Sequence, residues 1–249
     1  MTKVRILGSM GWMPARGQQT ACVLVETRGQ LLLLDAGTGV ANLAMCQDLL
    51  ARYDRLSILL SHYHLDHVCG LMYLKRFAAH MCVDVYGPGV PAYGRTTADY
   101  LSDLLQESVY SSGPRGFARE VHYTDYGGES FLVGDVHVGV RAQQHSAPSF
   151  ELRIEDDLVY ATDTCFDSQN WGNAAPARLL LHECWQLDNS DPRHTSVESL
   201  ASGLPRDAFG NVVLVHQNPS WDEAECARVE HEAKRCGFTL AHDGMEIEI

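Results

Sequence analysis

The sequence predicts a mixed α/β domain in which helices cover β-sheets, and three observations support this. Short apolar runs with strand character recur along all 249 residues. Segments with the apolar period of an amphipathic helix lie between those runs. No fixed-period repeat and no low-complexity linker divides the chain, so residues 1–249 are expected to form one domain. A chain of this length can bury enough surface to fold without disulfides.

The strands are expected at the apolar runs, where alternating or fully buried residues favour extended chain. They are Val4–Gly8, Cys22–Glu26, Leu31–Asp35, Leu56–Ser61, Val83–Tyr86, Phe131–Val133, Val136–Arg141, Phe150–Ile154, Leu158–Ala161, Leu179–Leu181 and Val212–His216. The early half is dense in strands and the later half alternates strand and helix, which is the pattern of a domain with helices packed on sheets.

The helices are expected where the apolar period lengthens to that of a helix. They are Gly39–Tyr53, Leu71–Ala79 and Thr96–Val109. Two later helices begin at the capping boxes Thr195–Glu198 and Ser220–Glu223, in which a hydroxyl and a carboxylate satisfy unpaired amides. The second of these ends at Cys236-Gly237, because glycine accepts the left-handed conformation of a C-cap.

The charge balance argues against large nucleic acids and acidic membranes as partners. The chain has 19 Lys and Arg against 32 Asp and Glu, a net charge of −13, and its basic residues are scattered. No apolar run approaches the roughly 20 residues of a membrane span, and Met1–Gly11 does not resemble a signal peptide. We therefore expect a cytoplasmic protein whose eight cysteines are reduced thiols.

The motif H-x-H-x-D-H at residues 62–67 places four metal-ligating side chains directly after an apolar strand. His62 and His64 are two residues apart, so in extended chain they project to one side and can hold one ion. Asp66 and His67 follow where the chain turns into a helix, which directs them toward a second ion. A solvated polar turn is the weaker interpretation, because three imidazoles packed together without an ion would repel one another on protonation.

Three further candidate ligands follow apolar strands later in the chain. His145 comes after the strand Val136–Arg141, Asp163 ends the run that begins at Leu158, and His216 ends the run that begins at Val212. A strand end holds the backbone still, as a metal site requires of its ligands. Each residue alone is more often an ordinary polar residue at a strand exit, but together with the first motif they predict a binuclear site.

This set of residues resembles the metallo-β-lactamase superfamily, an α/β fold built as a four-layer αββα sandwich with a dinuclear metal site along one edge. The resemblance covers nearly the whole chain: Gly8–Gly11, Thr20–Glu26 and Leu32–Gly39 are similar to the opening hairpins, and Ala241–Ile247 to the final strand. It implies that one metal is bound by three histidines, the other by an aspartate and two histidines, and that one aspartate bridges both. These are His62, His64 and His145, then Asp66, His67 and His216, with Asp163 as the bridge.

A second pair of segments narrows the branch of the family. Leu181–Cys184 and His194-Thr195-Ser196 are similar to the His-Glu-Ala and His-Ser-Thr segments of ribonuclease Z and its phosphodiesterase relatives. The resemblance implies that Glu183 and His194 act as a pair, with His194 contacting phosphate oxygens and helping to protonate the leaving group. Asp66 would orient the nucleophile as well as bind metal. His194 also precedes an expected helix, and helix N-termini favour phosphate.

The sequence departs from ribonuclease Z where that enzyme has a long basic arm for tRNA. The corresponding residues 87–119 predict a helix at Thr96–Tyr110 and a short loop, with Arg95, Arg115 and Arg119 as the basic residues. The lack of a basic arm and the net charge of −13 both disfavour binding of the tRNA phosphate backbone.

The predicted reaction is hydrolysis by a hydroxide shared between two divalent ions. The His and Asp ligand set suits zinc, and manganese or iron would also fit. The leading hypothesis is a phosphodiesterase acting on a small or cyclic phosphodiester or a short nucleotide. The alternatives are ribonuclease Z-like cleavage of an RNA 3′ end, lactone or thioester hydrolysis, and a metal-bearing sensor or accessory protein without turnover. Dimers are frequent in the superfamily, so a homodimer is expected by resemblance. The segments Gly11–Gln19 and Tyr93–Gly116 should shape the pocket, but neither has a readable motif.

Overall fold

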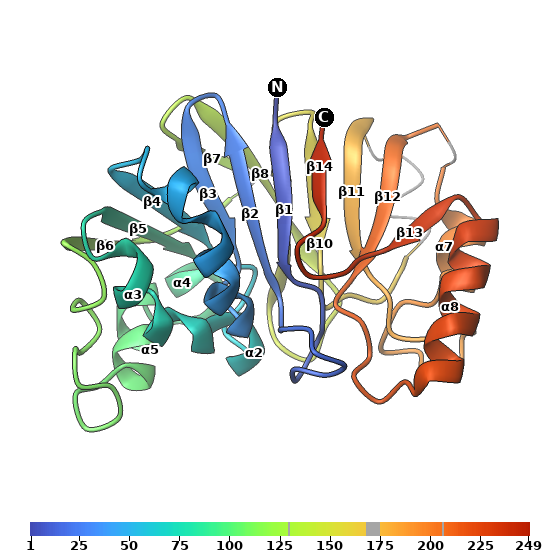
Figure 1. Ribbon diagram of the computed structural model, residues 1–249, viewed down its shortest axis with the longest axis horizontal. Coiled ribbons are helices and arrows are strands. Elements are labelled where there is room, and N and C mark those ends of the chain that lie inside the picture. Colours follow the sequence, from blue (N-terminus) through green and yellow to red (C-terminus); the bar gives the residue numbers. More distant parts are fainter. Residues whose placement is uncertain (129, 168–174, 206) are drawn as a thin grey trace.

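Two mixed β-sheets pack face to face in the computed structural model, which describes residues 1–128, 130–167, 175–205 and 207–249 (Figure 1). In these residues each sheet has seven strands. The first sheet runs, in spatial order, β14 (Glu246–Glu248), β1 (Lys3–Gly8), β2 (Cys22–Thr27), β3 (Gln30–Leu34), β4 (Arg55–Leu59), β5 (Cys82–Gly87) and β6 (Glu120–Asp125). The second runs β13 (Phe238–Leu240), β12 (Phe209–Val215), β11 (Ala177–Glu183), β10 (Leu158–Ala161), β9 (Ser149–Ile154), β8 (Val136–Gln143) and β7 (Ser130–Val133).

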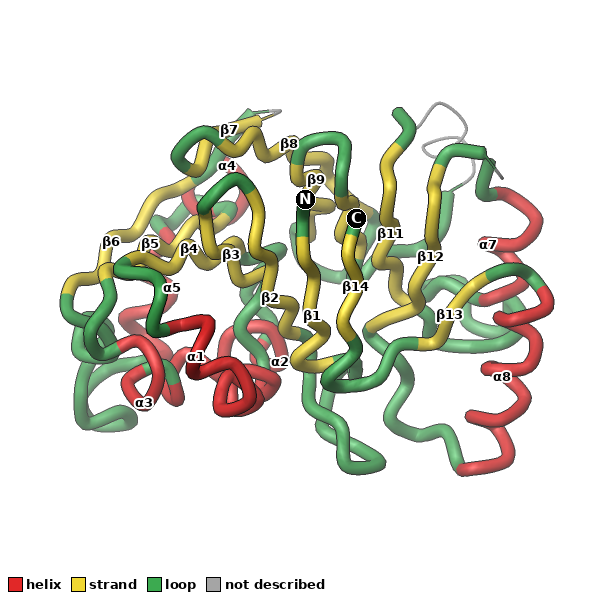
Figure 2. The backbone as a smooth tube through the Cα atoms, turned by 45° about the horizontal axis from the view of Figure 1, so that its top comes forward, coloured by secondary structure: helices red, strands yellow, loops and turns green. Residues whose placement is uncertain are grey.

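Helices cover the outer face of each sheet, which gives the four layers expected from the sequence (Figure 2). On the first sheet lie the 3-10 helices η1 (Thr38–Cys46) and η2 (Cys69–Tyr73) and the α-helices α1 (Gln47–Leu50), α2 (Leu65–Val68), α3 (Lys75–Ala78), α4 (Gly89–Tyr93) and α5 (Thr97–Leu104). On the second lie α7 (Val197–Gly203) and α8 (Glu223–Arg235). No helix in the described part of the chain has the length and apolar content to cross a membrane.

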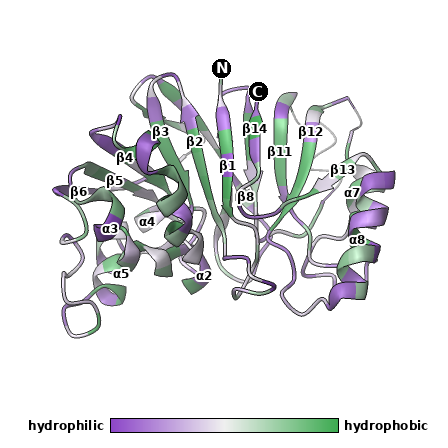
Figure 3. Ribbon diagram, in the orientation of Figure 1, coloured by the Kyte–Doolittle hydropathy of each residue, from purple (hydrophilic) through white to green (hydrophobic). Residues whose placement is uncertain are grey.

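Three apolar clusters hold the layers together. The central strands are apolar on both faces, and the outward side of α8 is polar (Figure 3). In β3, for example, Leu31 and Leu33 contact the helices while Leu32 and Leu34 contact the second sheet, because successive side chains of a strand point to opposite faces. Burial on both faces explains why such strands read as continuous apolar runs rather than as alternating patterns.

Several predicted elements need correction. The segment Gly39–Tyr53 is not one α-helix: its buried residues Val40, Leu43 and Cys46 recur every third position, and a 3-10 helix places that spacing on one face. Likewise Leu71–Ala79 forms the end of η2 followed by the single turn α3, and the helix predicted to run to Val109 ends at Leu104.

The caps of the two later helices are also shifted from their predicted residues. Helix α7 is capped by Ser196, which exchanges bonds with Ser199, because the hydroxyl of Thr195 instead donates to the carbonyl of Thr164. Helix α8 is capped by Asp222 rather than Ser220. The left-handed stop at Gly237 is as predicted, with φ of +82°.

The strands β6 and β13 do not appear among the predicted strands, and the final strand is shorter than Ala241–Ile247. Strand β6 lies at a sheet edge, where only Val121 of its six residues is buried, so it lacks the apolar run that marks the inner strands. Strand β14 pairs with β1 through Val4 and Ile247, so the two ends of the chain lie side by side (Figure 1).

Candidate metal centre

The candidate ligands converge at one edge of the sandwich because parallel strands of both sheets end there. Strands β3 and β4 are parallel neighbours in the first sheet, and β10, β11 and β12 are parallel neighbours in the second. Residues just beyond the carboxyl ends of parallel strands meet at a common edge, which is the usual place for a site in α/β folds. All seven predicted metal ligands and the predicted Glu183–His194 pair lie there.

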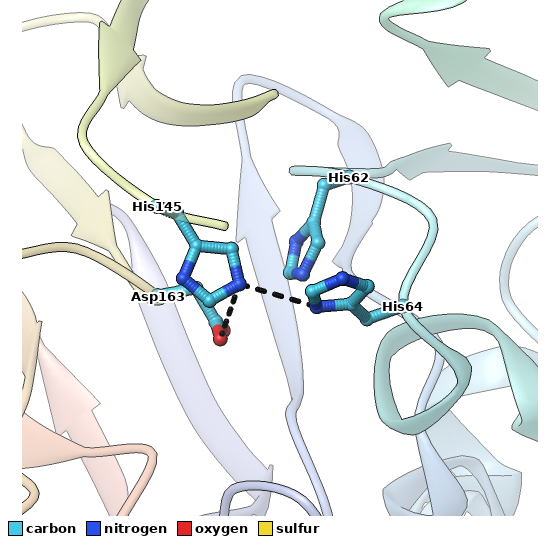
Figure 4. Close-up of side chains that lie close together, drawn as sticks. All are labelled: His62, His64, His145 and Asp163. Atoms are coloured by element: carbon cyan, nitrogen blue, oxygen red, sulfur yellow. Dashed lines mark hydrogen bonds and ion pairs between the residues drawn. The ribbon is translucent and has the colours of Figure 1, made fainter. Parts of the chain in front are cut away.

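The first group of side chains comprises His62, His64, His145 and Asp163 (Figure 4). In this group the Nε2 atom of His145 lies 3.1 Å from Nδ1 of His64 and 3.3 Å from Oδ1 of Asp163. His62 is fully buried beneath them, and its ring centroid lies 4.6 Å from that of His64. One ligand atom from each residue lies within 4.8 Å of the others, which is close enough to surround a single ion.

The second group comprises Asp66, His67 and His216. The Nε2 atoms of His67 and His216 are 3.3 Å apart, and Oδ2 of Asp66 lies 3.4 Å from the first and 3.5 Å from the second. Asp66 and His67 sit on the short helix α2, as the sequence predicts for the end of the motif.

Asp163 lies between the two groups and turns a different oxygen to each. Its Oδ1 atom faces His145 at 3.3 Å, and its Oδ2 atom faces His67 at 2.8 Å and His216 at 3.0 Å. This is the arrangement that a carboxylate needs in order to bridge two ions.

Asp35, Asp163 and His216 all adopt left-handed backbone, with φ of +54°, +52° and +49°. Non-glycine residues pay an energetic cost in this region, and such residues gather at functional sites where the surrounding fold enforces them. Asp35 and His216 immediately follow a strand, and Asp163 lies one residue further on. The abrupt turn of the backbone directs each side chain toward the candidate site at the edge of the sandwich.

Buried polar partners fix which nitrogen of each histidine faces the centre. Oδ2 of Asp35 accepts from Nδ1 of His67 at 2.7 Å and from the Ser61 hydroxyl at 2.8 Å. The Ser61 oxygen lies 3.0 Å from Nδ1 of His62. With both Nδ1 atoms engaged, the Nε2 atoms of His62 and His67 face the centre, which is the orientation that a metal requires.

The carboxylate of Glu183, buried at the end of β11, contacts two histidines. Its Oε1 atom lies 3.3 Å from Nδ1 of His194 and accepts from the backbone amide of Thr195 at 2.8 Å. Its Oε2 atom lies 3.6 Å from Nδ1 of His216. The indole of Trp185 stacks on the His194 ring at 4.5 Å between centroids, so this imidazole is held on two sides.

The electrostatics of the site keep its carboxylates ionised. Burial would raise the pKa of Asp66, but His67 and His216 hold it well below its usual range. Burial would likewise raise the pKa of Asp163, and again His216 and His67 hold it well below. Conversely, burial lowers the pKa of His62, and the neighbouring His67 lowers it further. His67 and His216 differ: burial would lower their pKa values, but the carboxylates of Asp66 and Asp163 raise them well above the usual range. A divalent ion would therefore have to displace protons from these two imidazoles when it binds.

The donor set fits such ions. The Nε2 atom of His62 is buried and has no hydrogen-bond partner in the described part of the chain, although it faces the other ligands. A buried polar atom without a partner is costly, and an ion at this position would satisfy it. Imidazole nitrogens and carboxylate oxygens suit zinc, manganese and iron alike.

Two cavities open on either side of this centre. One of about 310 Å³ is lined by His145 and His194, together with Gln144, Ser146, Cys165, Pro192 and Arg193. The other, of about 430 Å³, is lined by His64 and Asp66, together with Trp12, Pro14, Thr20, Thr38, Leu65 and Cys69. A substrate bound over the metal ligands would therefore extend into one or both of them.

The remaining histidines and the cysteines do not join the centre. The exposed histidines away from the centre are His80, His122, His137, His231 and His242. His182 is buried and its Nδ1 atom bonds the carbonyl of Glu183. Cys184 is buried, and Cys69 and Cys165 line the two cavities without contributing to the ligand groups of the described residues.

Sequence reasoning missed Asp35, Ser61, Trp12 and Trp185. The signal for Asp35 was a carboxylate that ends a fully apolar strand, but its partners Ser61, His67 and Tyr160 are far away in the sequence. Trp12 donates its backbone N–H to Oδ2 of Asp66 at 2.7 Å, and a backbone contact leaves no trace in the choice of side chain.

Comparison with known proteins places these features in context. The model of the family described as Anti-Pycsar protein Apyc1 matches residues 3–243. Ribonuclease Z of Methanopyrus kandleri is 28% identical over 237 residues, covering 92% of this chain and 78% of that protein. Anti-Pycsar protein Apyc1 of Paenibacillus harenae is 26% identical over 215 residues, covering 80% of this chain and 83% of that protein.

Among solved structures, a diphosphatase from the PhnP family superimposes with a TM-score of 0.76, at 16% identity, covering 100% of this chain and 98% of that one. This likeness confirms the predicted fold class, the αββα sandwich.

Proposed function

The chain belongs to the Anti-Pycsar protein Apyc1 family, in the ribonuclease Z-like part of the metallo-β-lactamase superfamily of hydrolases, and on this premise we propose that it is a phosphodiesterase. Its substrate would be a small or cyclic phosphodiester or a short nucleotide. The observation that carries the proposal is the pair formed by the buried Glu183 and the half-buried His194 beside the candidate metal ligands, in which His194 lines a cavity together with His145.

We propose two divalent ions in this centre, with zinc as the expected metal. His62, His64 and His145 would hold one ion, Asp66, His67 and His216 the other, and Asp163 both. The interatomic distances support this division, because Oδ1 of Asp163 faces the first group and Oδ2 faces the second. When bound, the ions would activate water and neutralise charge on the phosphoryl oxygens.

The chain's own residues would orient and protonate the reacting groups. Asp66 is held by the Trp12 amide through the same oxygen that faces His67 and His216, so its carboxylate is fixed before substrate arrives. Glu183 engages Nδ1 of His194, which leaves Nε2 of that ring for a phosphate oxygen or for the departing oxygen. The stacked Trp185 ring prevents the imidazole from turning away.

A small substrate is favoured by charge and by cavity size. The net charge of −13 opposes binding of a long polyanion, and Arg95, Arg115 and Arg119 do not form a cationic strip. Arg95 pairs with Asp103, and Arg115 donates to the carbonyl of Val121. Cavities of about 310 and 430 Å³ match a mononucleotide or dinucleotide rather than a folded RNA.

Cleavage of an RNA 3′ end is the second candidate, favoured by the similarity to ribonuclease Z over 92% of this chain. It differs from the first in substrate length, so a tRNA precursor and a cyclic mononucleotide separate the two. The homodimer and the cytoplasmic location remain predictions, to be tested by light scattering and by fractionation of cells.

The decisive experiment counts metals and measures turnover in the same preparation. Bis(p-nitrophenyl) phosphate would be assayed beside a p-nitrophenyl carboxylic ester and an acyl lactone. We expect two metals per chain and turnover of the diester, with turnover lost in His194→Ala while the metals are retained. The exposed His231→Ala serves as the matched control and should change neither. Ester or lactone turnover alone would refute the phosphodiesterase, and less than one metal per chain would refute the centre itself.

A further inference from the structure

Trp12 stands exposed beside the candidate metal centre although its backbone is rigidly held. Its N–H donates to Oδ2 of Asp66 at 2.7 Å, and its φ is +59°, a conformation that a bulky residue rarely adopts. Its side chain nevertheless remains 65% exposed. A large aromatic ring fixed at its base and open to solvent is well suited to contact a ligand.

The loop that carries Trp12 is fixed on both sides. The Gly11 amide donates to the carbonyl of Gln217 at 3.0 Å, and a Cβ at Gly11 would lie only 2.4 Å from the His216 ring, so glycine is required there. At the ends of the loop, Asp243 accepts from the amides of Ser9 and Gln19 at 3.0 and 2.8 Å. The position of the indole is therefore set by the same contacts that build the centre.

The indole lines the cavity that His64 and Asp66 share, and it forms an apolar wall there together with Pro14 and Leu65. Leu65 is itself 61% exposed. The cavity on the other side of the centre contains His194 and polar residues instead. The two sides of the centre thus differ in character: one is suited to a flat apolar group, and the other to a charged or departing oxygen.

Resting on the phosphodiesterase function proposed above, we propose that Trp12 is the stacking platform for the nucleobase of a nucleotide substrate. The phosphodiester then lies over the metal ligands, and the ester oxygen that departs faces His194. Every nucleobase has a π-face, so stacking on an indole contributes binding for all bases, worth about tenfold or more in affinity. Because this contact is equally present in the ground state and the transition state, it acts on KM rather than on kcat.

The test uses two diesters with the same leaving group. Thymidine 5′-(p-nitrophenyl phosphate) carries a base, whereas methyl p-nitrophenyl phosphate does not, and both release p-nitrophenol. We expect the thymidine ester to have the lower KM, and we expect Trp12→Ala to raise that KM about tenfold while kcat stays within about twofold. The same variant should raise the KM of the methyl ester far less than that of the thymidine ester, and Trp12→Phe should restore most of the affinity.

Met13→Ala is the matched control, because Met13 is 48% exposed on the same loop but does not line the cavity. Titration with thymidine 5′-monophosphate gives a second readout that does not depend on turnover, and Trp12→Ala should weaken this binding about tenfold relative to inorganic phosphate. An equal change for both esters, or unchanged binding of thymidine 5′-monophosphate, would overturn the stacking role and leave the phosphodiesterase intact. Turnover of neither ester would instead refute the phosphodiesterase, with the titration still deciding the role of Trp12.

Discussion

Replacing Asp35 by asparagine is expected to weaken metal binding without disturbing the backbone. Asp35 touches none of the proposed ions, but its Oδ2 atom accepts from His67, Ser61 and Tyr160 at 2.7, 2.8 and 2.9 Å. Its Oδ1 atom accepts from the Ser61 amide at 2.7 Å. Asparagine has the same shape and tolerates the φ of +54°, so the variant removes charge and one acceptor only.

The magnitude follows from how the amide must lie. If the asparagine oxygen takes the position of Oδ2, it still accepts from His67, Ser61 and Tyr160. The asparagine NH₂ group then replaces Oδ1, so the backbone N–H of Ser61 loses its acceptor. Leaving that buried donor unpaired costs about 1–3 kcal/mol of folding stability. Losing the negative charge behind His67 makes this imidazole a poorer ligand, and such changes cost roughly 10–100-fold in metal affinity, or about 1.4–2.7 kcal/mol.

A chelator-competition titration measures the affinity, and thermal unfolding of the metal-free protein measures the stability. Asp157→Asn is the matched control: Asp157 immediately precedes β10, at the opposite end of that strand from Asp163, and its carboxylate accepts a hydrogen bond from the Thr2 hydroxyl. This control should lose stability but keep its metal affinity. If Asp35→Asn binds metal as tightly as the unaltered protein, Asp35 does not act through His67.

Three other perturbations probe the same edge. His194→Ala should lower kcat for a phosphodiester by about 10²–10⁴-fold while elemental analysis finds the metals unchanged; loss of metal would make it a ligand instead. Gly11→Ala should lower both metal content and turnover, because its Cβ would lie 2.4 Å from the buried His216 ring. Gly17→Ala on the same loop is the control: its Cβ would meet nothing within 4 Å, so this variant should lower stability alone. For the metal-free protein, the folded-state pKa of Asp163 is depressed below the usual 3.8, chiefly by His216 against the effect of burial. Its stabilising contribution is therefore fully present above about pH 4 and is lost as the pH falls further, so the melting temperature should drop below about pH 4; a profile that stays flat there would contradict this.

The sequence was informative where burial is continuous. Runs such as Leu31–Leu34 and Val212–Val215 are apolar because both faces of their strands are covered, and both runs are strands in the structure. Edge strands follow another rule, since β6 has a solvent-facing side and only Val121 marks its buried face. The position of a helix cap such as Ser196 depends on which group the hydroxyl of Thr195 bonds. That hydroxyl donates to the carbonyl of Thr164, 31 residues away in the sequence.

The candidate site divides along the same line. Residues 62–67 could be assigned as a unit because the spacing itself carries the chemistry. Asp35 and Trp12 could not be assigned from the sequence, because their roles depend on contacts with distant residues. Asp35 contacts His67, 32 residues away, and Trp12 contacts Asp66, 54 residues away, through its backbone amide alone. The assignment of individual residues to each ion stays a prediction until metals are counted in variants.

The pairing of β1 with β14 has a consequence for biosynthesis. The two strands pair through Val4 and Ile247, so one edge of β1 stays uncovered until β14 has been synthesised. Asp243, which holds the loop of Trp12, is synthesised shortly before β14. A nascent chain can therefore complete most of both sheets on the ribosome yet have neither a closed edge nor an ordered loop beside its centre. Pairing of β14 with β1 and closure of the Asp243 contacts should therefore be late steps in ordering the loop beside the centre.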